Sequence, residues 1–290
     1  MSGKDFGSAQ APTRIAYGDD AERRRGAPST QVSDALDDVL AVRAAEVGRA
    51  ALEVVDVGAG TGGFAVRLAK LGHHVTVVDP SPDALAAARW RAAEAGVTLT
   101  AVQGEASEIA GLVGDGAADL VVCHNVLEYV DSPAAAMAAI ARVLRPGGTV
   151  SVLAANMVAA VLQRALAGRY EDARRLLTAN AADPAPGAGA GAGAVPGAAP
   201  ARVPGSAPAR VPAQSLTEHR RFTLAELTAL IEGAGLRAGD AHGVRIFAGL
   251  LPGVGADPAA ADALRDLEAA AADYPALRDI AARLHIFGCR

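Results

Sequence analysis

The stretch that decides the fold is residues 53–64, which read Glu53-Val54-Val55-Asp56-Val57-Gly58-Ala59-Gly60-Thr61-Gly62-Gly63-Phe64. Its valines form a short β-branched run that is typical of a buried parallel strand. The glycines that follow allow a sharp turn and a close approach to a ligand, because they carry no Cβ. Residues 64–71 then place apolar side chains at helical spacing, and Gly72 marks the end of that predicted helix. A strand, a glycine turn and a helix N-terminus predict a nucleotide pocket lined by free backbone N–H groups.

A second acidic residue follows at the distance such a pocket requires. Asp79 ends the apolar run 75–78 and lies seventeen residues after Gly62. At the tip of the neighbouring strand, its carboxylate can accept hydrogen bonds from two ribose hydroxyls. Gly58, Gly60 and Gly63 also satisfy the spacing G-x-G-x-x-G, so an NAD(P)-binding oxidoreductase is an alternative interpretation of the same loop.

Composition limits the classes of protein to which the chain can belong. It has 290 residues, of which 51% are hydrophobic and only 3% aromatic, enough for one large domain or two small ones. Its apolar runs are shorter than the roughly 20 residues that a membrane span needs, and its polar N-terminus lacks a signal peptide, so we expect a cytoplasmic protein. A net charge of −5 argues against binding nucleic acid over the whole surface, although a local basic patch would suffice. Cys123 and Cys289 have no metal-ligand spacing, so no metal is expected.

The rest of the chain alternates predicted strands and helices, which indicates an α/β protein with a doubly wound, mostly parallel sheet. Strands are predicted near 97–102, 118–123, 149–154, 243–247 and 283–287, and a helix over 156–177. Ligands of such a sheet bind outside the carboxyl ends of its strands. We divide the chain into a flexible arm (1–30), a cofactor-binding core (31–181), a disordered Ala/Gly/Pro insertion (182–214), and a C-terminal part of the same sheet that carries the substrate face (215–290).

These segments resemble a known family. Residues 54–62, with Asp56 just before the loop, resemble motif I of class I S-adenosylmethionine (SAM) methyltransferases, and the turn at 144–148 is common in that class. The stretches 124–130, 243–247 and 267–285 more particularly resemble bacterial tRNA 5-carboxymethoxyuridine methyltransferases. The resemblance implies a seven-stranded sheet whose last strand is antiparallel, SAM as cofactor, and methyl esterification of a modified wobble uridine in the tRNA anticodon.

The resemblance also implies a set of cofactor contacts. They are Arg25, Asp56, Gly58, Ala59, Gly60, Gly62, Asp79, Ala106, Ser107 and His124. In this set the glycine loop and Asp56 hold the methionine end of SAM, and Asp79 holds its ribose. Ala106 and Ser107 lie near the adenine, and His124 closes the pocket. The N-terminal arginine is Arg25 or one of its neighbours Arg23 and Arg24.

The methyl acceptor is less well defined. The insertion and the lack of a family-like basic run leave a second hypothesis, a SAM methyltransferase of a small metabolite or natural product. A non-catalytic binding module on the same fold is a third. A carboxylate acceptor is anionic, so it needs a cation to hold it rather than a general base. Arg245 is our catalytic candidate for that cation, and a structural ion pair with a buried acid is the alternative role for this residue.

Overall fold

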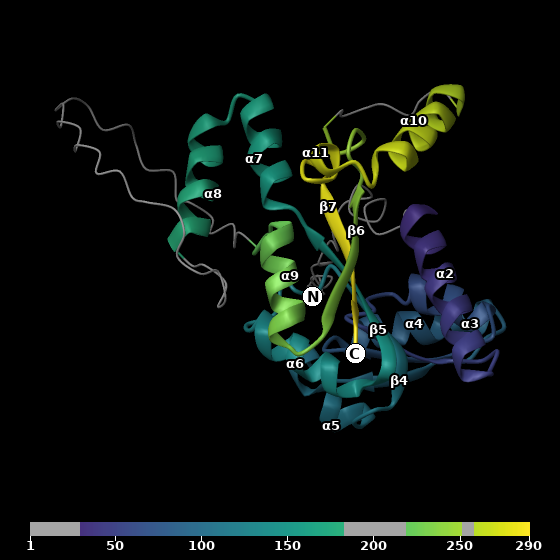
Figure 1. The fold of residues 1–290 in the computed structure, drawn as a ribbon. Coiled ribbons are helices and arrows are strands. Elements are labelled where there is room, and N and C mark those ends of the chain that lie inside the picture. Colours follow the sequence, from purple (N-terminus) through teal and green to yellow (C-terminus); the bar gives the residue numbers. More distant parts are fainter. Residues whose placement is uncertain (1–29, 183–218, 251–257) are drawn as a thin grey trace, which may run out of the picture.

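The computed structural model describes residues 30–182, 219–250 and 258–290, which form one α/β sheet with its helices (Figure 1). The strands are β1 (Glu53–Val57), β2 (His74–Asp79), β3 (Thr100–Gln103), β4 (Ala118–His124), β5 (Leu144–Ala155), β6 (Arg237–Val244) and β7 (Arg283–Cys289). The helices are α2 (Thr30–Val47), α3 (Gly63–Lys70), α4 (Pro82–Glu94), the 3₁₀ turn η1 (Ala106–Glu108), α5 (Ile109–Val113), α6 (Pro133–Val143), α7 (Met157–Leu166), α8 (Tyr170–Ala182), α9 (Leu224–Gly233), α10 (Pro258–Ala271) and α11 (Pro275–Arg278).

The seven strands lie in the order β3-β2-β1-β4-β5-β7-β6. Strands β1 to β5 pair in parallel, and β7 runs antiparallel to both of its neighbours. The order reverses beside β1, because β1 is bonded to β2 on one side and to β4 on the other. This reversal is the switch point at which open α/β sheets bind their ligands. The predicted mixed, doubly wound sheet is thereby confirmed.

Two hydrophobic layers cover the sheet. On one face, side chains of β1, β4, β5 and β7 pack against α5, α6 and α9. On the other face, the alternate residues of β1, β2 and β4 pack against α2, α3 and α4. The central strands β1 and β4 are buried on both faces, which is why their sequences are continuous apolar runs rather than alternating ones. Their carboxyl ends are consequently held rigidly.

The carboxyl ends of β5 and β6 meet a group of four helices, α7, α8, α10 and α11, which lie at the top of Figure 1. Asn156 joins this group to the sheet. Its amide side chain is buried and donates to the carbonyls of Asp279 and Ala281, at 2.9 and 2.8 Å. The side-chain oxygen of Asn156, Oδ1, accepts a hydrogen bond from the Val158 amide and so caps α7.

The helix capping signals of the sequence are present in the structure. Ser81 accepts from the Ala84 amide at the start of α4, where Pro82 occupies the first turn. Thr223 and Glu226 form the predicted capping box of α9.

Three expected elements are wrong in detail. The helix predicted over 156–177 is two helices, α7 and α8, because Gly168 adopts a φ of +73° that an α-helix does not contain. The strand predicted at 243–247 ends at Val244, since Arg245 has a φ of +59° and turns the chain away. The strand expected at 149–154 begins earlier, at Leu144, and the turn lies within it as an irregularity, because Leu144 pairs with Ala118 and Thr149 with Leu120 while residues 145–148 have no partner in β4.

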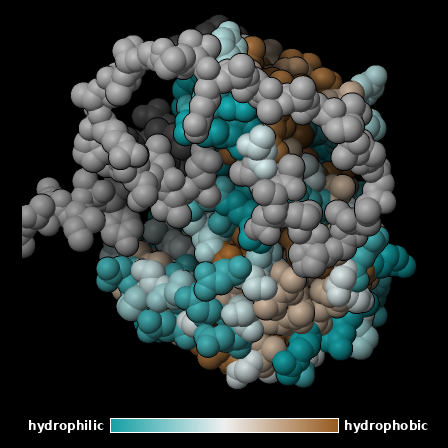
Figure 2. All heavy atoms as spheres, turned by 90° about the vertical axis from the view of Figure 1, so that its left-hand side faces the viewer, coloured by the Kyte–Doolittle hydropathy of each residue, from teal (hydrophilic) through white to brown (hydrophobic). Residues whose placement is uncertain are grey.

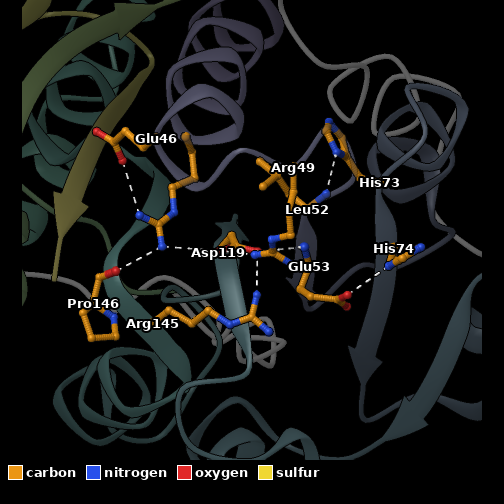
Figure 3. Close-up of polar contacts among 10 residues, drawn as sticks. Glu46, Arg49, Leu52, Glu53, His73, His74, Asp119, Arg145 and Pro146 are labelled. Atoms are coloured by element: carbon orange, nitrogen blue, oxygen red, sulfur yellow. Dashed lines mark hydrogen bonds and ion pairs between the residues drawn. The ribbon is translucent and has the colours of Figure 1, made fainter.

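The amino end of β4 carries a cluster of charges that the sequence analysis did not single out (Figure 3). The Asp119 carboxylate is buried and contacts three guanidinium groups, from Arg145 at 2.6 Å, Arg49 at 3.0 Å and Arg43 at 3.4 Å. It also accepts from the Glu53 amide at 3.1 Å. Burial works to raise the pKa of Asp119, but this amide and the three cations together hold it below its usual value.

The face of the molecule that lies to the left in Figure 1 is mixed in character. Figure 2 shows hydrophilic and hydrophobic residues side by side on the face that lies to the left in Figure 1. On α8, Arg174 and Arg175 pair with Glu171 and Asp172 one turn earlier, so these two arginines form an ordinary exposed helix face. Among the described residues, no helix combines the length and hydropathy that a membrane crossing requires.

Candidate functional site

The glycine loop after β1 forms the centre of the site. Gly58, Gly60 and Gly62 all adopt positive φ values, between +51° and +72°, which residues with a Cβ adopt only at a cost. A Cβ on Gly58 would lie 2.4 Å from a methyl group of Val126, and one on Gly62 would lie 2.6 Å from the Ala88 Cβ. A Cβ on Gly60 would meet no protein atom within 4 Å. Gly58 and Gly62 therefore serve close packing, whereas Gly60 borders open space in which a ligand can lie.

Asp79 fixes the shape of that loop. Its carboxylate is buried and accepts from the Gly60 amide and the Ser81 amide, each at 2.9 Å. The Gly104 amide donates to the backbone carbonyl of Asp79 at 3.3 Å, which brings the loop after β3 to the same place. A carboxylate oxygen has more than one lone pair, so Asp79 can accept from a ribose hydroxyl while it holds the loop. The sugar contact is predicted from the sequence, whereas this structural role of Asp79 is apparent only in the structure.

Asp56 lies beneath the loop with one carboxylate oxygen, Oδ2, buried and without a hydrogen-bond partner. Burial and the nearby charge of Asp79 raise its pKa to about 7, against a weaker opposing effect of the Ala65 amide. A buried acid of this kind is stabilised by a cation placed beside it. The sulfonium and ammonium groups of SAM are cations of the required type.

His124 ends β4 on the same edge and is hydrogen-bonded away from solvent. Its Nε2 lies 2.7 Å from the Ser151 hydroxyl, which lies 2.8 Å from Nε2 of the buried His285. The edge of the His124 ring meets the Phe64 ring in the first turn of α3, at 5.1 Å between centroids. Burial, and secondarily the charge of Arg283, lower the pKa of His124 to about 3, so its imidazole is neutral. A ring held by a strand and a helix closes the pocket rigidly.

Two residues after β4 were not among the predicted contacts. Asn125 has a φ of +58°, and its side-chain Oδ1 is buried without a partner. Glu128 is buried as well; one oxygen accepts from the Ala155 amide at 2.8 Å and the other, Oε2, has no partner. Burial raises the pKa of Glu128, against the opposing effects of two amides and of Arg283 and Arg221. Asn125 is one residue and Glu128 four residues after His124, and this proximity in the sequence was the available signal.

Two cations of this edge lie at the ends of the last two strands. Arg283 begins β7 between Ala155 of β5 and Val244 of β6, and its charge acts on both His124 and Glu128. Arg245 follows β6, three strands from β4, which is about 14 Å at the usual strand spacing. Among the described residues, the Arg245 guanidinium has no hydrogen bond or ion pair, so the buried-acid alternative for it has no support.

The remaining predicted cofactor contacts differ in how exposed their side chains are. Ala106 and Ser107 lie in η1, after the Gly104 loop that meets Asp79. The Ala106 side chain packs in the core, so only its backbone could reach an adenine, while Ser107 is exposed. Ala59 is half-buried within the glycine loop. Arg25 lies outside the described residues.

The structure therefore brings Asp56, the glycine loop, Asp79 and His124 to one edge and places Arg245 farther along it. This arrangement fits SAM on three observations: an open space before Gly60, an unpartnered buried carboxylate at Asp56, and a second carboxylate at the tip of β2. Within the described residues, no group of three or more His, Cys, Asp or Glu side chains could hold a metal ion.

Comparison with known proteins agrees with this geometry. Residues 55–152 match the family model for the methyltransferase domain. The ubiquinone biosynthesis O-methyltransferase of Aeromonas salmonicida is 39% identical over 103 residues, which are 36% of this chain and 43% of that protein. The tRNA 5-carboxymethoxyuridine methyltransferase of Escherichia coli K12 is 32% identical over 138 residues, 47% of this chain and 51% of that protein. The chain thus matches about half the length of these relatives.

Solved structures share the fold beyond this region. A SAM-dependent methyltransferase from Methanosarcina mazei aligns with a TM-score of 0.52 and 18% identity, over 83% of this chain and 93% of that one. The [4+2]-cyclase SpnF aligns with a TM-score of 0.51 and 19% identity, over 90% and 82%. At such identities the likeness shows the fold alone, and the cyclase is a reminder that function depends on the site.

The matched region contains β1 to β5 and with them the loop, Asp56, Asp79 and His124. Family model and fold therefore agree that residues 55–152 form a methyltransferase domain of the class I type, which uses S-adenosylmethionine as cofactor.

Proposed function

We propose that this protein transfers a methyl group from SAM to a carboxylate oxygen of a 5-carboxymethoxyuridine-type wobble nucleotide in tRNA. The observation that carries the proposal is the Arg245 guanidinium, which lies at the acceptor end of the sheet without a partner among the described residues. Arg283, one strand closer to the cofactor site, adds a second positive charge. Guanidinium groups are well suited to carboxylates, because their planar fork can donate two parallel hydrogen bonds.

For methyl transfer to a carboxylate, the main task of the protein is to position the two reactants. SAM supplies an electrophilic methyl group on a sulfonium when it is bound. A carboxylate is already a nucleophile at neutral pH, so no side chain has to remove a proton. Holding two reactants in line can lower a barrier by about 7–11 kcal/mol in favourable cases. The glycine loop and Asp79 would orient the cofactor, and Arg245, which follows β6, and Arg283 of β7 would orient the acceptor.

A polynucleotide acceptor is supported by an exposed aromatic pair beside the site. Tyr129, which directly follows Glu128, is 63% exposed, and its ring lies 4.4 Å from the ring of His219. Arg220 and Arg221 follow His219 in the chain. Unpaired bases of RNA stack on aromatic rings, while arginines bind the neighbouring phosphates. The similarity to the tRNA methyltransferase of Escherichia coli points in the same direction.

A second candidate function rests on Glu128. Its unpartnered Oε2 and raised pKa are properties of a general base, which a hydroxyl acceptor would need. The similarity to ubiquinone biosynthesis O-methyltransferases supports methylation of a hydroxyl group on a small molecule. In that case Glu128 rather than Arg245 would be the decisive residue of the acceptor site.

One assay separates the two candidates. Purified protein is incubated with methyl-labelled SAM and with tRNA that carries 5-carboxymethoxyuridine, and the same tRNA with unmodified uridine serves as the control. Our proposal predicts label only in the modified tRNA, and its release by mild alkali, because methyl esters hydrolyse where methyl ethers do not. No label in either tRNA, with alkali-stable label in a small phenol offered in its place that is lost in Glu128→Gln but not in Arg245→Ala, would support the hydroxyl acceptor instead.

A further inference from the structure

Arg245 occupies an unusual backbone conformation for an arginine. It is one of two residues other than glycine with positive φ in the described part of the chain, and the other, Asn125, tolerates this conformation more readily. Both residues directly follow the carboxyl end of a strand, β6 and β4 respectively. A strained residue persists only where its surroundings determine its conformation. The contacts that determine it are therefore informative.

The main contact is a buried carboxylate from a distant helix. Glu268 of α10 is only 8% exposed and accepts hydrogen bonds from three consecutive amides that follow Arg245. The donors are the amides of Ile246, Phe247 and Ala248, at 2.7, 2.8 and 2.8 Å. Hydrogen bonds from N–H groups to an ionised acceptor are stronger than those between neutral groups. Glu268 has no ion-pair partner among the described residues, so its charge acts on this turn.

The turn is also held from the other side. The Arg245 carbonyl accepts from the amides of Gly249 and Ala282, at 3.1 and 3.3 Å. Gln163 of α7 donates to the Gly249 carbonyl at 2.9 Å. A Cβ on Gly249 would lie 2.6 Å from the Arg245 carbonyl oxygen, which explains the glycine. The backbone around Arg245 is thereby fixed to the residue that precedes β7, to α7 and to α10 at once.

We propose that Glu268 is a positioning residue, which holds the 245–248 turn so that the Arg245 guanidinium meets the anionic group of the methyl acceptor. This inference rests on the proposed function, in which Arg245 binds the acceptor carboxylate. Glu268 itself does not touch the acceptor, because its two oxygens are occupied by the three amides. Its effect passes through the backbone to the arginine.

The alternative is that Glu268 only anchors α10. A double-mutant cycle distinguishes the two, since a residue that acts solely through Arg245 has no further effect once Arg245 is gone. The variants are Glu268→Gln, Arg245→Ala and their combination. Asp266→Asn is the matched control, because it removes one exposed carboxylate from the same helix without touching the turn. Glu268→Asp tests whether a shorter carboxylate restores part of the effect.

Two readouts are needed. Hydrogen exchange of the amides of residues 246–248 reports the turn without any acceptor, and we expect Glu268→Gln to accelerate it about tenfold or more. With tRNA carrying 5-carboxymethoxyuridine, we expect KM to rise about tenfold in Glu268→Gln while kcat and the SAM dissociation constant change little. The double variant should match Arg245→Ala, and Asp266→Asn should match the wild type.

Each contrary result has a separate meaning. A KM effect of Glu268→Gln that adds in full to that of Arg245→Ala would overturn the positioning role, as would unchanged exchange and KM in Glu268→Gln. A wild-type protein that does not methylate this tRNA would refute the proposed function and, with it, the acceptor role of Arg245. In that case the exchange measurement still reports whether Glu268 holds the turn, so the two failures are distinguishable.

Discussion

The amino and carboxyl ends of the parallel strands hold acidic residues in opposite circumstances. At the amino end, the buried Asp119 carboxylate forms ion pairs with three arginines and accepts a hydrogen bond from an amide. These partners lower its pKa. At the carboxyl end, Asp56 and Glu128 are also buried, yet each keeps an oxygen without a partner, and their pKa values are raised. In the part of the chain that the structure describes, both residues other than glycine with positive φ lie at this end too.

This difference separates stability from function within one sheet. A satisfied buried charge ties elements together, as Asp119 joins the end of α2 and the starts of β1 and β5 (Figure 3). Unsatisfied buried groups and strained backbone cost free energy and persist where a ligand compensates for them. We therefore expect substitutions at the amino end to change unfolding, and substitutions at the carboxyl end to change binding.

The largest expected effect is on stability, from Asp119→Ala. The change leaves three guanidinium groups and the Glu53 amide without their shared acceptor, and breaking such a buried cluster costs about 3 kcal/mol. Urea unfolding measures the loss. The SAM dissociation constant of the folded variant should be unchanged.

The control for this prediction is an exposed pair. Asp115 and Arg142 form an ion pair in which the side chains are 59% and 64% exposed, so Asp115→Ala should cost less than about 0.5 kcal/mol. Equal costs for Asp119→Ala and Asp115→Ala would show that the amino end is not the stabilising one.

A smaller effect is expected on the pH dependence of SAM binding. Asp56 has a pKa of about 7 in the free protein, and a cationic ligand beside it favours the ionised form. Binding should therefore release a proton below pH 7, and affinity should rise with pH, by at most about tenfold per unit, until it levels off above pH 7. Calorimetry in buffers of different ionisation enthalpy counts the released protons.

Asp56→Asn is the variant that tests the assignment of this proton. The amide cannot ionise, so the pH dependence between 6 and 7 should disappear even if affinity itself falls. If the same dependence remained, another group, such as Glu128, would be the one that titrates.

The sequence predicted the features that depend on local pattern. The β-branched run of β1, the glycine loop and the caps of α4 and α9 are set by residues close together in the chain. For the same reason, Asp56 and Asp79 could be proposed as cofactor contacts from their spacing to the glycines. The structure places them where that spacing predicts.

The features that failed depend on distant contacts. Arg245 was expected inside a strand because apolar residues surround it, and no local signal reveals that Glu268, over twenty positions later, ends the strand there. Strand β6 begins earlier than expected because an edge strand can be polar, as residues 237–242 are. Glu128 and Arg283 were not predicted as site residues, because the charge of Arg283 acts on Glu128 only when β7 lies beside β5.

Calorimetry of SAM binding to two glycine variants tests the central claim most directly. Gly48, at the amino end of the sheet, and Gly60 both have positive φ and open space before a Cβ, so Gly48→Ala and Gly60→Ala should each cost about 1–2 kcal/mol of stability. We predict that Gly48→Ala binds SAM as the wild type does, and that Gly60→Ala gives no heat of binding. Binding of wild-type strength by Gly60→Ala would contradict the account.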